Sequence, residues 1–239
     1  MADVDDLLDR LVRGVVRGAS EGVPLPMRLC LTAVSILGGT GGAITLAYTH
    51  LERVTLCATD STARTLEEAQ DVLAQGPAPE AYTTGSYTRL DVDSDLTPDP
   101  RWPILLTSGV TSLGPLVLHA IPLGRGADSV GVLSVYQSGL EVQLDVAAAT
   151  VLGLAVGAAL LADAPTRSDA GQGEWDERAR VHQATGMVLA QLGIGPADSV
   201  ALLRAHAYAH DRTLTDVAAD VIDRRLVFAS TPGKEITSS

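Results

Sequence analysis

The sequence contains few aromatic residues and few cysteines. Aromatic residues make up 3% of its 239 residues, and Phe228 is the one phenylalanine. This scarcity limits base stacking, because proteins that bind single strands use aromatic side chains as platforms. The two cysteines, Cys30 and Cys57, are too few for a disulfide framework or a zinc site with four cysteine ligands, and they fit a reducing cytoplasm.

Positive charge is also scarce. Lys and Arg number 17 against 29 Asp and Glu, a formal net charge of −12, and Lys234 is the one lysine. This balance argues against simple electrostatic attachment to nucleic acid or to anionic membranes. The charge is uneven, because residues 1–171 carry a net −10 and residues 172–230 a net −2. Basic side chains therefore balance the acidic ones more closely in the C-terminal part.

Neither a targeting segment nor a membrane span is expected. The N-terminus begins with aspartate-rich sequence rather than the basic region of a signal peptide. The longest apolar run, Val146 to Ala162, has 17 residues between Asp145 and Asp163. A spanning helix needs about 20 apolar residues. We therefore expect a buried or dimer-forming helix here.

What the chain does have is 46% apolar residues with 19% charged ones, a composition that can bury a core. Its apolar spacing predicts an α+β fold for the N-terminal part, an antiparallel sheet flanked by helices. The glycine-rich stretch Gly38 to Gly42 reads as a turn, since the Lys-Ser/Thr of a phosphate-binding loop is missing. The predicted helices cover residues 3–18, 28–37, 63–74 and 141–162, and the predicted strands cover 43–48, 53–60, 87–91, 116–123 and 129–137.

The domain organisation follows from composition. Residues 1–163 form the predicted sheet domain, and the Gly/Ser/Asp-rich residues 164–173 form a linker. Residues 174–230 form an all-α bundle of three helices, and residues 231–239 form a disordered tail.

The three C-terminal helices have recognisable ends. The first covers about 175–192 and stops at Gly193, where we expect a Schellman motif with Ile194 folding back on Leu189. The second begins at Pro196, a residue suited to the first helical position. The third begins after Thr213, whose spacing to an acidic residue three positions later is that of a capping box.

Four short motifs follow one another within residues 178–226. They are "QATGM" at 183–187, "LG" at 192–193, "LLR" at 202–204 and "VAADV" at 217–221. In this order and at this spacing they resemble an ANTAR domain. Thr185 stands where many relatives have lysine. The resemblance implies a three-helix module that binds paired hairpin loops in nascent leader RNA and prevents terminator formation.

Three stretches of the N-terminal part carry a second resemblance. They are "LCATDSTARTLEEAQDVLAQGPAPEAYTTG" at 56–85, "DPRWP" at 99–103 and "AIPLGRGADSVGVLSVYQSG" at 120–139. They resemble the GAF sensor domain that precedes ANTAR in such regulators of actinobacterial type. Many relatives have Gly-Pro-Cys where this chain has Gly76-Pro77-Ala78, so thiol chemistry is absent at that position. The resemblance implies sensing of a small-molecule ligand or a signalling partner.

The predicted RNA-binding residues combine guanidinium groups, which suit phosphates and stack on bases, with polar groups beside a glycine. They are Arg178, Arg180, Gln183, Thr185, Gly186, Arg204, Arg212, Arg224 and Arg225. For any one arginine the alternative is a solvated surface with local ion pairs, such as Asp220 with Arg224 four residues later.

Gly186 has two readings, since a glycine in a helix costs about 1 kcal/mol relative to alanine. We favour close packing of another segment against it, and the other reading is approach of an RNA backbone. The two readings are compatible on opposite sides of one helix.

Other functions receive less support. His206 and His210 stand four apart but have no evident third ligand, so no metal is expected, nor any other cofactor. No catalytic constellation stands out, and an enzyme is not expected. The leading reading is a cytoplasmic, homodimeric, RNA-binding antitermination regulator. The alternative is a dimeric protein-interaction module whose ANTAR part has lost RNA binding, as the acidity and Thr185 would favour.

Overall fold

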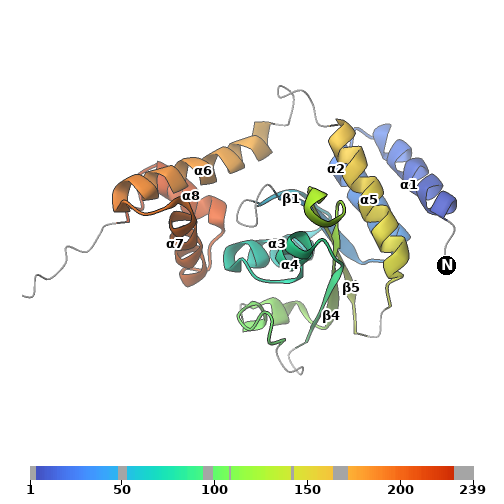
Figure 1. Ribbon diagram of the computed structural model, residues 1–239, viewed down its shortest axis with the longest axis horizontal. Helices are drawn as coiled ribbons and strands as arrows, with labels where there is room; N and C mark the ends of the chain where they lie inside the picture. The colour runs from blue at the N-terminus through green and yellow to red at the C-terminus, as the bar shows by residue number, and fades with distance from the viewer. Residues whose placement is uncertain are drawn as a thin grey trace, which may run out of the picture. The chain divides into compact units, whose positions relative to one another are not determined.

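The computed structural model describes residues 4–47, 53–93, 99–107, 109–140, 143–163 and 172–228. The chain divides into two compact units, Met1–Ala170 and Gly171–Ser239 (Figure 1). Most of the predicted linker, residues 164–171, and the predicted tail, residues 231–239, lie outside the described residues. The domain boundaries given above therefore stay predictions.

The first unit is built on a five-stranded sheet in which every pairing is antiparallel. Its strand order is β2-β1-β5-β4-β3. The strands are β1 (Gly41–Ala47), β2 (Arg53–Ala58), β3 (Thr88–Val92), β4 (Leu116–Pro122) and β5 (Gly131–Ser138). The predicted antiparallel sheet is confirmed, and each predicted strand corresponds to an observed one.

Helices cover both faces of this sheet. On one face α2 (Leu25–Ile36) and α5 (Val146–Asp163) share a core with the strands, and α1 (Val4–Ala19) packs outside them on both helices (Figure 1). On the other face α3 (Ser61–Leu73) and α4 (Pro77–Thr84) cover the sheet. Alternation along the strands supplies both cores, because successive side chains point to opposite faces.

Two sequence predictions were wrong in this unit. Helix α4 covers residues for which the sequence predicted neither a helix nor a strand; Pro77 opens the helix and Gly85, at φ +63°, closes it. Helix α5 begins at Val146 rather than near residue 141, because the Asp145 carboxylate accepts hydrogen bonds from the Ala147 and Ala148 amides at 3.0 and 3.1 Å.

Helix α5 owes its Ala/Gly-rich composition to close packing. A Cβ atom at Gly153 would lie 2.5 Å from the Pro122 carbonyl oxygen, and one at Gly157 would lie 2.7 Å from that of Leu123. By length and composition alone α5 is the one described helix that could cross a membrane. In the structure it packs on α1, α2, β4 and β5, as expected for a buried helix.

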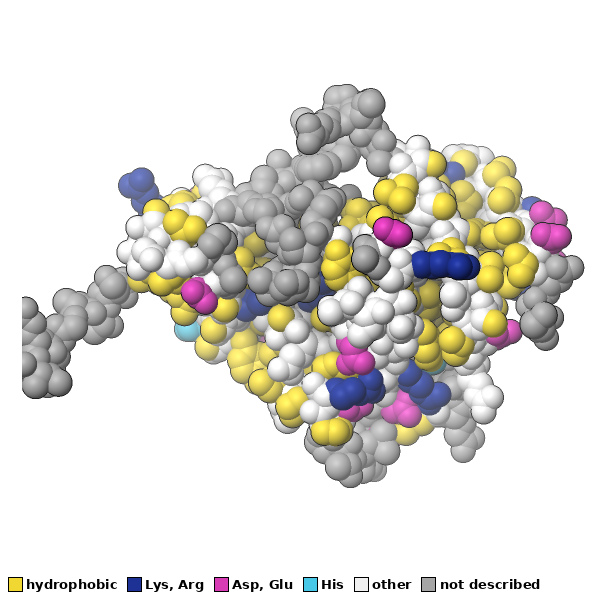
Figure 2. Space-filling model, viewed as in Figure 1, with side chains coloured by type: hydrophobic (Ala, Val, Ile, Leu, Met, Phe, Trp, Pro, Cys, Tyr) yellow, Lys and Arg dark blue, Asp and Glu magenta, His cyan; other side chains and the backbone are white. Residues whose placement is uncertain are grey.

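The outer helices of this face leave apolar side chains at the surface. Val12 is 60% exposed and Val16 64% exposed on α1, and Leu161 is 60% exposed on α5. Hydrophobic side chains are correspondingly visible over this region of the molecule (Figure 2).

The second unit consists of α6 (Gln172–Leu192), α7 (Pro196–Ala209) and α8 (Leu214–Ile222). Its core is formed by buried residues from all three helices, namely Ala184, Val188, Val200, Leu203, Ala207, Leu214, Val217, Ala218 and Val221. The predicted three-helix bundle is confirmed.

The helix ends follow the sequence signals with one exception. Pro196 opens α7, and the Thr213 hydroxyl accepts a hydrogen bond from the Asp216 amide at 3.1 Å. At the end of α6, Gly193 has φ +66° and its amide donates to the Leu189 carbonyl at 2.8 Å. This bond is that of an αL motif rather than the predicted Schellman motif.

Candidate nucleic-acid interface

Helix α6 presents three of the predicted residues on one exposed face. Arg180, Gln183 and Gly186 are exposed, whereas Ala184 and Val188 are buried in the bundle. A spacing of three residues keeps side chains on the same side of a helix. The sequence therefore places a cation, an amide and an open backbone position along one surface strip.

No other segment within the described part of the chain packs closely against Gly186. A Cβ atom built there would meet no atom of the described residues within 4 Å. The interpretation of Gly186 as a site of close packing with another segment of the chain therefore has no contact to support it among the described residues. A contact with another molecule would still explain the glycine, since an alanine would stabilise the helix.

Thr185 and Arg204 lie inside the bundle. Thr185 is 8% exposed, and its hydroxyl donates to the Val181 carbonyl at 2.7 Å. Arg204 is 5% exposed and is engaged by an interaction within the chain. Both residues have structural roles in this arrangement, and direct contact with RNA would require them to become exposed.

Arg212 and Arg225 converge on one carboxylate. A guanidinium nitrogen of Arg212 bonds to one oxygen of Asp220, and Arg225 Nε bonds to the other at 2.7 Å. The hydrogen bonds from Arg212 and Arg225 hold the pKa of Asp220 below its ordinary value. Arg225 also pairs with Asp223 at 2.7 Å, yet its side chain remains 61% exposed.

The predicted pair of Asp220 with Arg224 does not form. Helix α8 ends at Ile222, and Arg224 adopts the left-handed backbone conformation at φ +58°. A spacing of four residues brings side chains together only while the helix continues. Arg224 is consequently exposed beyond the helix end, and Arg225 takes its place on Asp220.

The side chain of Arg178 lies outside the described residues, although its backbone belongs to α6. The structure thus gathers the described candidates into two groups. Arg180, Gln183 and Gly186 form the α6 strip, and Arg212 and Arg225 surround Asp220.

The sequence analysis missed a cluster of rings beside the second group. The His206 and His210 rings stack with centroids 4.0 Å apart, and the Phe228 ring meets His206 edge-on at 5.8 Å. The spacing of four between the two histidines is the sequence signal for this pair, because residues four apart are neighbours on a helix. In the described residues, no group of three or more His, Cys, Asp or Glu side chains is placed to hold a metal.

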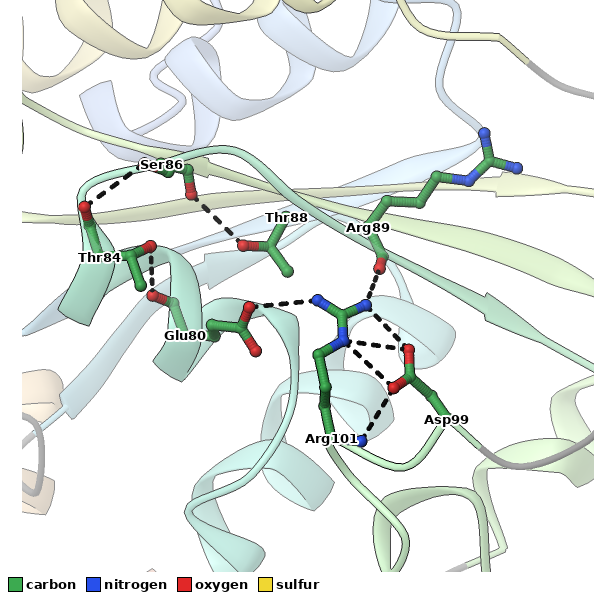
Figure 3. A network of polar contacts seen from close by, with 7 residues as sticks. All are labelled: Glu80, Thr84, Ser86, Thr88, Arg89, Asp99 and Arg101. Atoms are coloured by element: carbon green, nitrogen blue, oxygen red, sulfur yellow. Dashed lines mark hydrogen bonds and ion pairs between the residues drawn. The ribbon is translucent and has the colours of Figure 1, made fainter.

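In the first unit, the "DPRWP" stretch forms a polar network around Arg101. Its guanidinium bonds to Asp99 at 2.8 Å, to Glu80 of α4 at 3.1 Å and to the Arg89 carbonyl of β3 at 3.3 Å (Figure 3). The hydrogen bond from Arg101 also lowers the pKa of Asp99. The guanidinium lies 4.0 Å over the Trp102 ring. This network fixes the loop to α4 and β3.

A second network is buried on the other face of the sheet. His119 is fully buried, with its ring nitrogens 2.8 Å from the Tyr87 hydroxyl and 2.8 Å from the Gln137 side-chain oxygen. Burial lowers the pKa of His119, so the neutral ring is favoured. Gln137 continues the network to the Gly38 carbonyl at 3.1 Å.

The cysteines lie together in this unit. A hydrogen bond with the Cys57 side chain raises the pKa of the Cys30 thiol, and burial raises this pKa further. A protonated thiol is a poor nucleophile. Cys30 is buried and Cys57 is half-buried.

Comparison with known proteins assigns the second unit. The ANTAR domain family model matches residues 172–222, so the ANTAR part of the resemblance is confirmed. Among curated proteins, none matches the chain significantly.

Two solved structures show weaker similarity. The GAF-B domain of DevS from Mycobacterium smegmatis is 19% identical, with a TM-score of 0.40, over 59% of this chain and 94% of that one. An RNA-binding light-oxygen-voltage receptor is 14% identical, with a TM-score of 0.23, over 77% of this chain and 48% of that one. At these TM-scores neither similarity supports a conclusion about this chain.

Proposed function

We propose, because residues 172–222 match the ANTAR domain, that this chain is a transcription antitermination regulator. Its second unit binds hairpins in leader RNA, and its first unit senses a small ligand or a signalling partner. The family match is the observation that carries the proposal. No catalytic role and no resident cofactor or metal form part of it.

The α6 strip supports an RNA contact. Arg180 offers guanidinium donors, Gln183 offers an amide, and Gly186 leaves room for an RNA backbone or base. Proteins read RNA sequence mainly in unpaired loops, whose bases are accessible to side chains. Arg224 and Arg225 add exposed cations beyond α8.

The first unit supports a sensing role through its fold and its GAF-like sequence stretches. Its antiparallel sheet carries helices on both faces, and the "DPRWP" stretch fixes a loop against α4. Two free thiols are compatible with a cytoplasmic protein.

We further propose that the protein is a homodimer joined through α1 and α5. Val12, Val16 and Leu161 are each at least 60% exposed on these two helices. Exposed apolar side chains on two helices that pack on each other favour association with a second copy. Sedimentation at micromolar concentration should give a dimer, and a Val12→Glu/Val16→Glu variant should give a monomer. A wild-type monomer would refute the dimer.

The test of RNA binding is a selection. Full-length protein is incubated with a pool of RNAs that carry two hairpins with randomised loops, and bound RNA is amplified and sequenced. We expect enrichment of a common loop sequence and weaker binding by an Arg180→Ala/Arg224→Ala variant. Failure of any RNA to enrich over the starting pool would refute the proposal.

The alternative is a dimeric protein-interaction module that no longer binds RNA. Two observations favour it, namely that Asp220 engages Arg212 and Arg225, and that Arg204 is buried. In that case the selection fails while the protein remains folded and dimeric.

A further inference from the structure

The second unit concentrates ring side chains next to its arginines. His206 lies on the last turn of α7, His210 is the residue that follows this helix, and Phe228 follows α8 in the chain. Their rings form one continuous cluster, with His206 stacked on His210 at an interplanar angle of 23° and edge-on to Phe228 at 76°. A cluster of this kind presents an aromatic surface even in a chain with few aromatic residues.

Local hydrogen bonds hold the cluster in place. His210 Nδ1 lies 2.9 Å from the His206 carbonyl oxygen, which fixes the outer imidazole over the inner one. The Phe228 amide donates to the Gln191 side-chain oxygen at 3.0 Å, which fixes the chain after α8 against α6. These bonds orient the rings before any partner arrives, and preorganisation lowers the cost of binding.

His210 is the outer ring of the cluster. Its side chain is exposed, whereas that of His206 is half-buried. Within the part of the chain that the structure describes, His206 is the one ring that contacts His210. Because His210 is exposed and stacks on His206 on one side, part of its ring is accessible to another planar group.

The charges around the cluster nearly cancel. Arg212 adjoins the rings but is paired with Asp220, and Arg225 is shared between Asp220 and Asp223. Asp211, which follows His210, is exposed. A surface of this kind attracts a polyanion only weakly, so an RNA contact here must draw its affinity from stacking rather than from phosphate binding.

We propose that His210, backed by His206 and Phe228, is a stacking platform for one unpaired base of an RNA loop. The proposal rests on the proposed RNA binding and names a contact that this binding uses. A base stacks on an exposed imidazole face as it does on other aromatic side chains, largely irrespective of its identity. Arg212, which is paired with Asp220, follows His210 by two residues in the chain.

The experiment uses the full-length protein and one hairpin RNA enriched by the selection described above. Each loop nucleotide is replaced in turn by an abasic residue, and the dissociation constant is measured for wild-type protein and for His210→Leu. We expect one loop position at which loss of the base weakens binding to wild-type protein by about tenfold to a hundredfold. At that position the same loss should leave binding to His210→Leu unchanged.

Two further variants serve as controls. His210→Phe keeps an aromatic face and should bind within about threefold of wild type, because stacking requires the face rather than the ring nitrogens. Tyr208→Ala removes another exposed ring from the same helix, 47% exposed but outside the cluster, and should bind like wild type. Circular dichroism verifies that every variant is folded.

The outcomes separate the two proposals. If wild-type protein binds no hairpin, RNA binding itself is refuted. If wild-type protein binds but every abasic substitution affects wild type and His210→Leu equally, the stacking platform is refuted while RNA binding stands. Equal loss of affinity in His210→Phe and His210→Leu would likewise refute stacking.

Discussion

The two units use arginine and ring side chains in opposite ways. In the first unit Arg101 joins Glu80, the Arg89 carbonyl and Asp99, which lie in three separate segments of the chain, and Trp102 beneath it is 4% exposed. In the second unit Arg212 and Arg225 share Asp220, and the outer ring, His210, is exposed.

The two units differ in which parts of the chain their arginines connect. A guanidinium that joins distant segments stabilises the fold, and removing it frees a loop. Arg225 is 61% exposed and pairs with nearby carboxylates, those of Asp220 and Asp223, and exposed pairs of this kind contribute little to stability. Such a residue is available to a partner, and so is an exposed ring. The first unit therefore uses these residue types for structure, and the second offers them for binding.

The largest expected effect is on the stability of the first unit. Trp102→Ala removes a buried ring from the core beneath α3 and should lower the free energy of unfolding by about 3–5 kcal/mol. Tyr208→Ala, at a ring 47% exposed in the second unit, should change it by less than about 0.5 kcal/mol. Urea denaturation followed by circular dichroism measures both. Equal effects would remove the contrast between the units.

Arg101→Ala should have a smaller effect. It removes the bonds to Glu80, Asp99 and the Arg89 carbonyl, and we expect a loss of about 1 kcal/mol because the side chain is 46% exposed and solvent screens its charge. Arg101→Lys should recover only part of this loss, since lysine lacks the planar fork. The same denaturation experiment applies. A variant as stable as wild type would show that the network does not hold the loop.

Gly186→Ala tests the open position on α6. Because a Cβ atom there meets no atom of the described residues within 4 Å, alanine should raise stability by up to about 1 kcal/mol. Gly186→Leu should remain folded but lose RNA affinity if RNA approaches the backbone. A thermal melt and a binding titration are run on both variants. If Gly186→Leu unfolds, some contact with the glycine must exist after all.

Arg225→Ala should change stability little, because the exposed pairs with Asp220 and Asp223 are weak. If Arg225 touches a phosphate, the variant should reduce the slope of log affinity against log salt by about 1. Arg204→Ala is the contrasting case, since Arg204 is buried and its loss should act mainly on stability. If Arg225→Ala leaves the slope of log affinity against log salt unchanged, Arg225 is a solvated surface residue that does not contact a phosphate.

The smallest expected effect concerns pH, because it involves one proton on one buried ring. His119 has a lowered pKa in the folded protein, so the unfolded chain binds a proton more readily. Stability should therefore fall as the pH drops below about 6.5, the ordinary value for histidine, and continue to fall until the folded pKa is reached. His119→Gln should remove this component. A wild-type protein whose stability does not change between pH 7 and pH 5 would contradict the prediction.

Sequence patterns predicted the fold better than they predicted the site. Alternation and helical spacing located the strands and most helices, since burial of one face imposes a period on the sequence. Pro196, Thr213 and Gly193 marked helix ends because capping is local chemistry. The sequence did not predict helix α4, because this helix is short and its buried residues include small ones, such as Ala78 and Ala81, which give no strong apolar pattern.

The candidate site was predicted by residue type, and residue type does not reveal neighbours. Arg178, Arg180, Arg204, Arg212, Arg224 and Arg225 were equivalent in the sequence. In the structure Arg204 is buried and Arg224 is exposed beyond a helix end. Arg225 pairs with Asp220, which is the partner predicted for Arg224. Each of these outcomes depends on where a helix stops and what packs beside it.

By itself the sequence determined the α+β character of the first unit, the three helices of the second and the ANTAR identity of residues 172–222, because these rest on local periodicity, capping and motif spacing. The tertiary structure alone decided that Asp220 gathers two arginines and that His206, His210 and Phe228 form one ring cluster. The physical reason is distance along the chain. Phe228 and His206 are brought together only when α7 and α8 pack, and no local pattern records that contact.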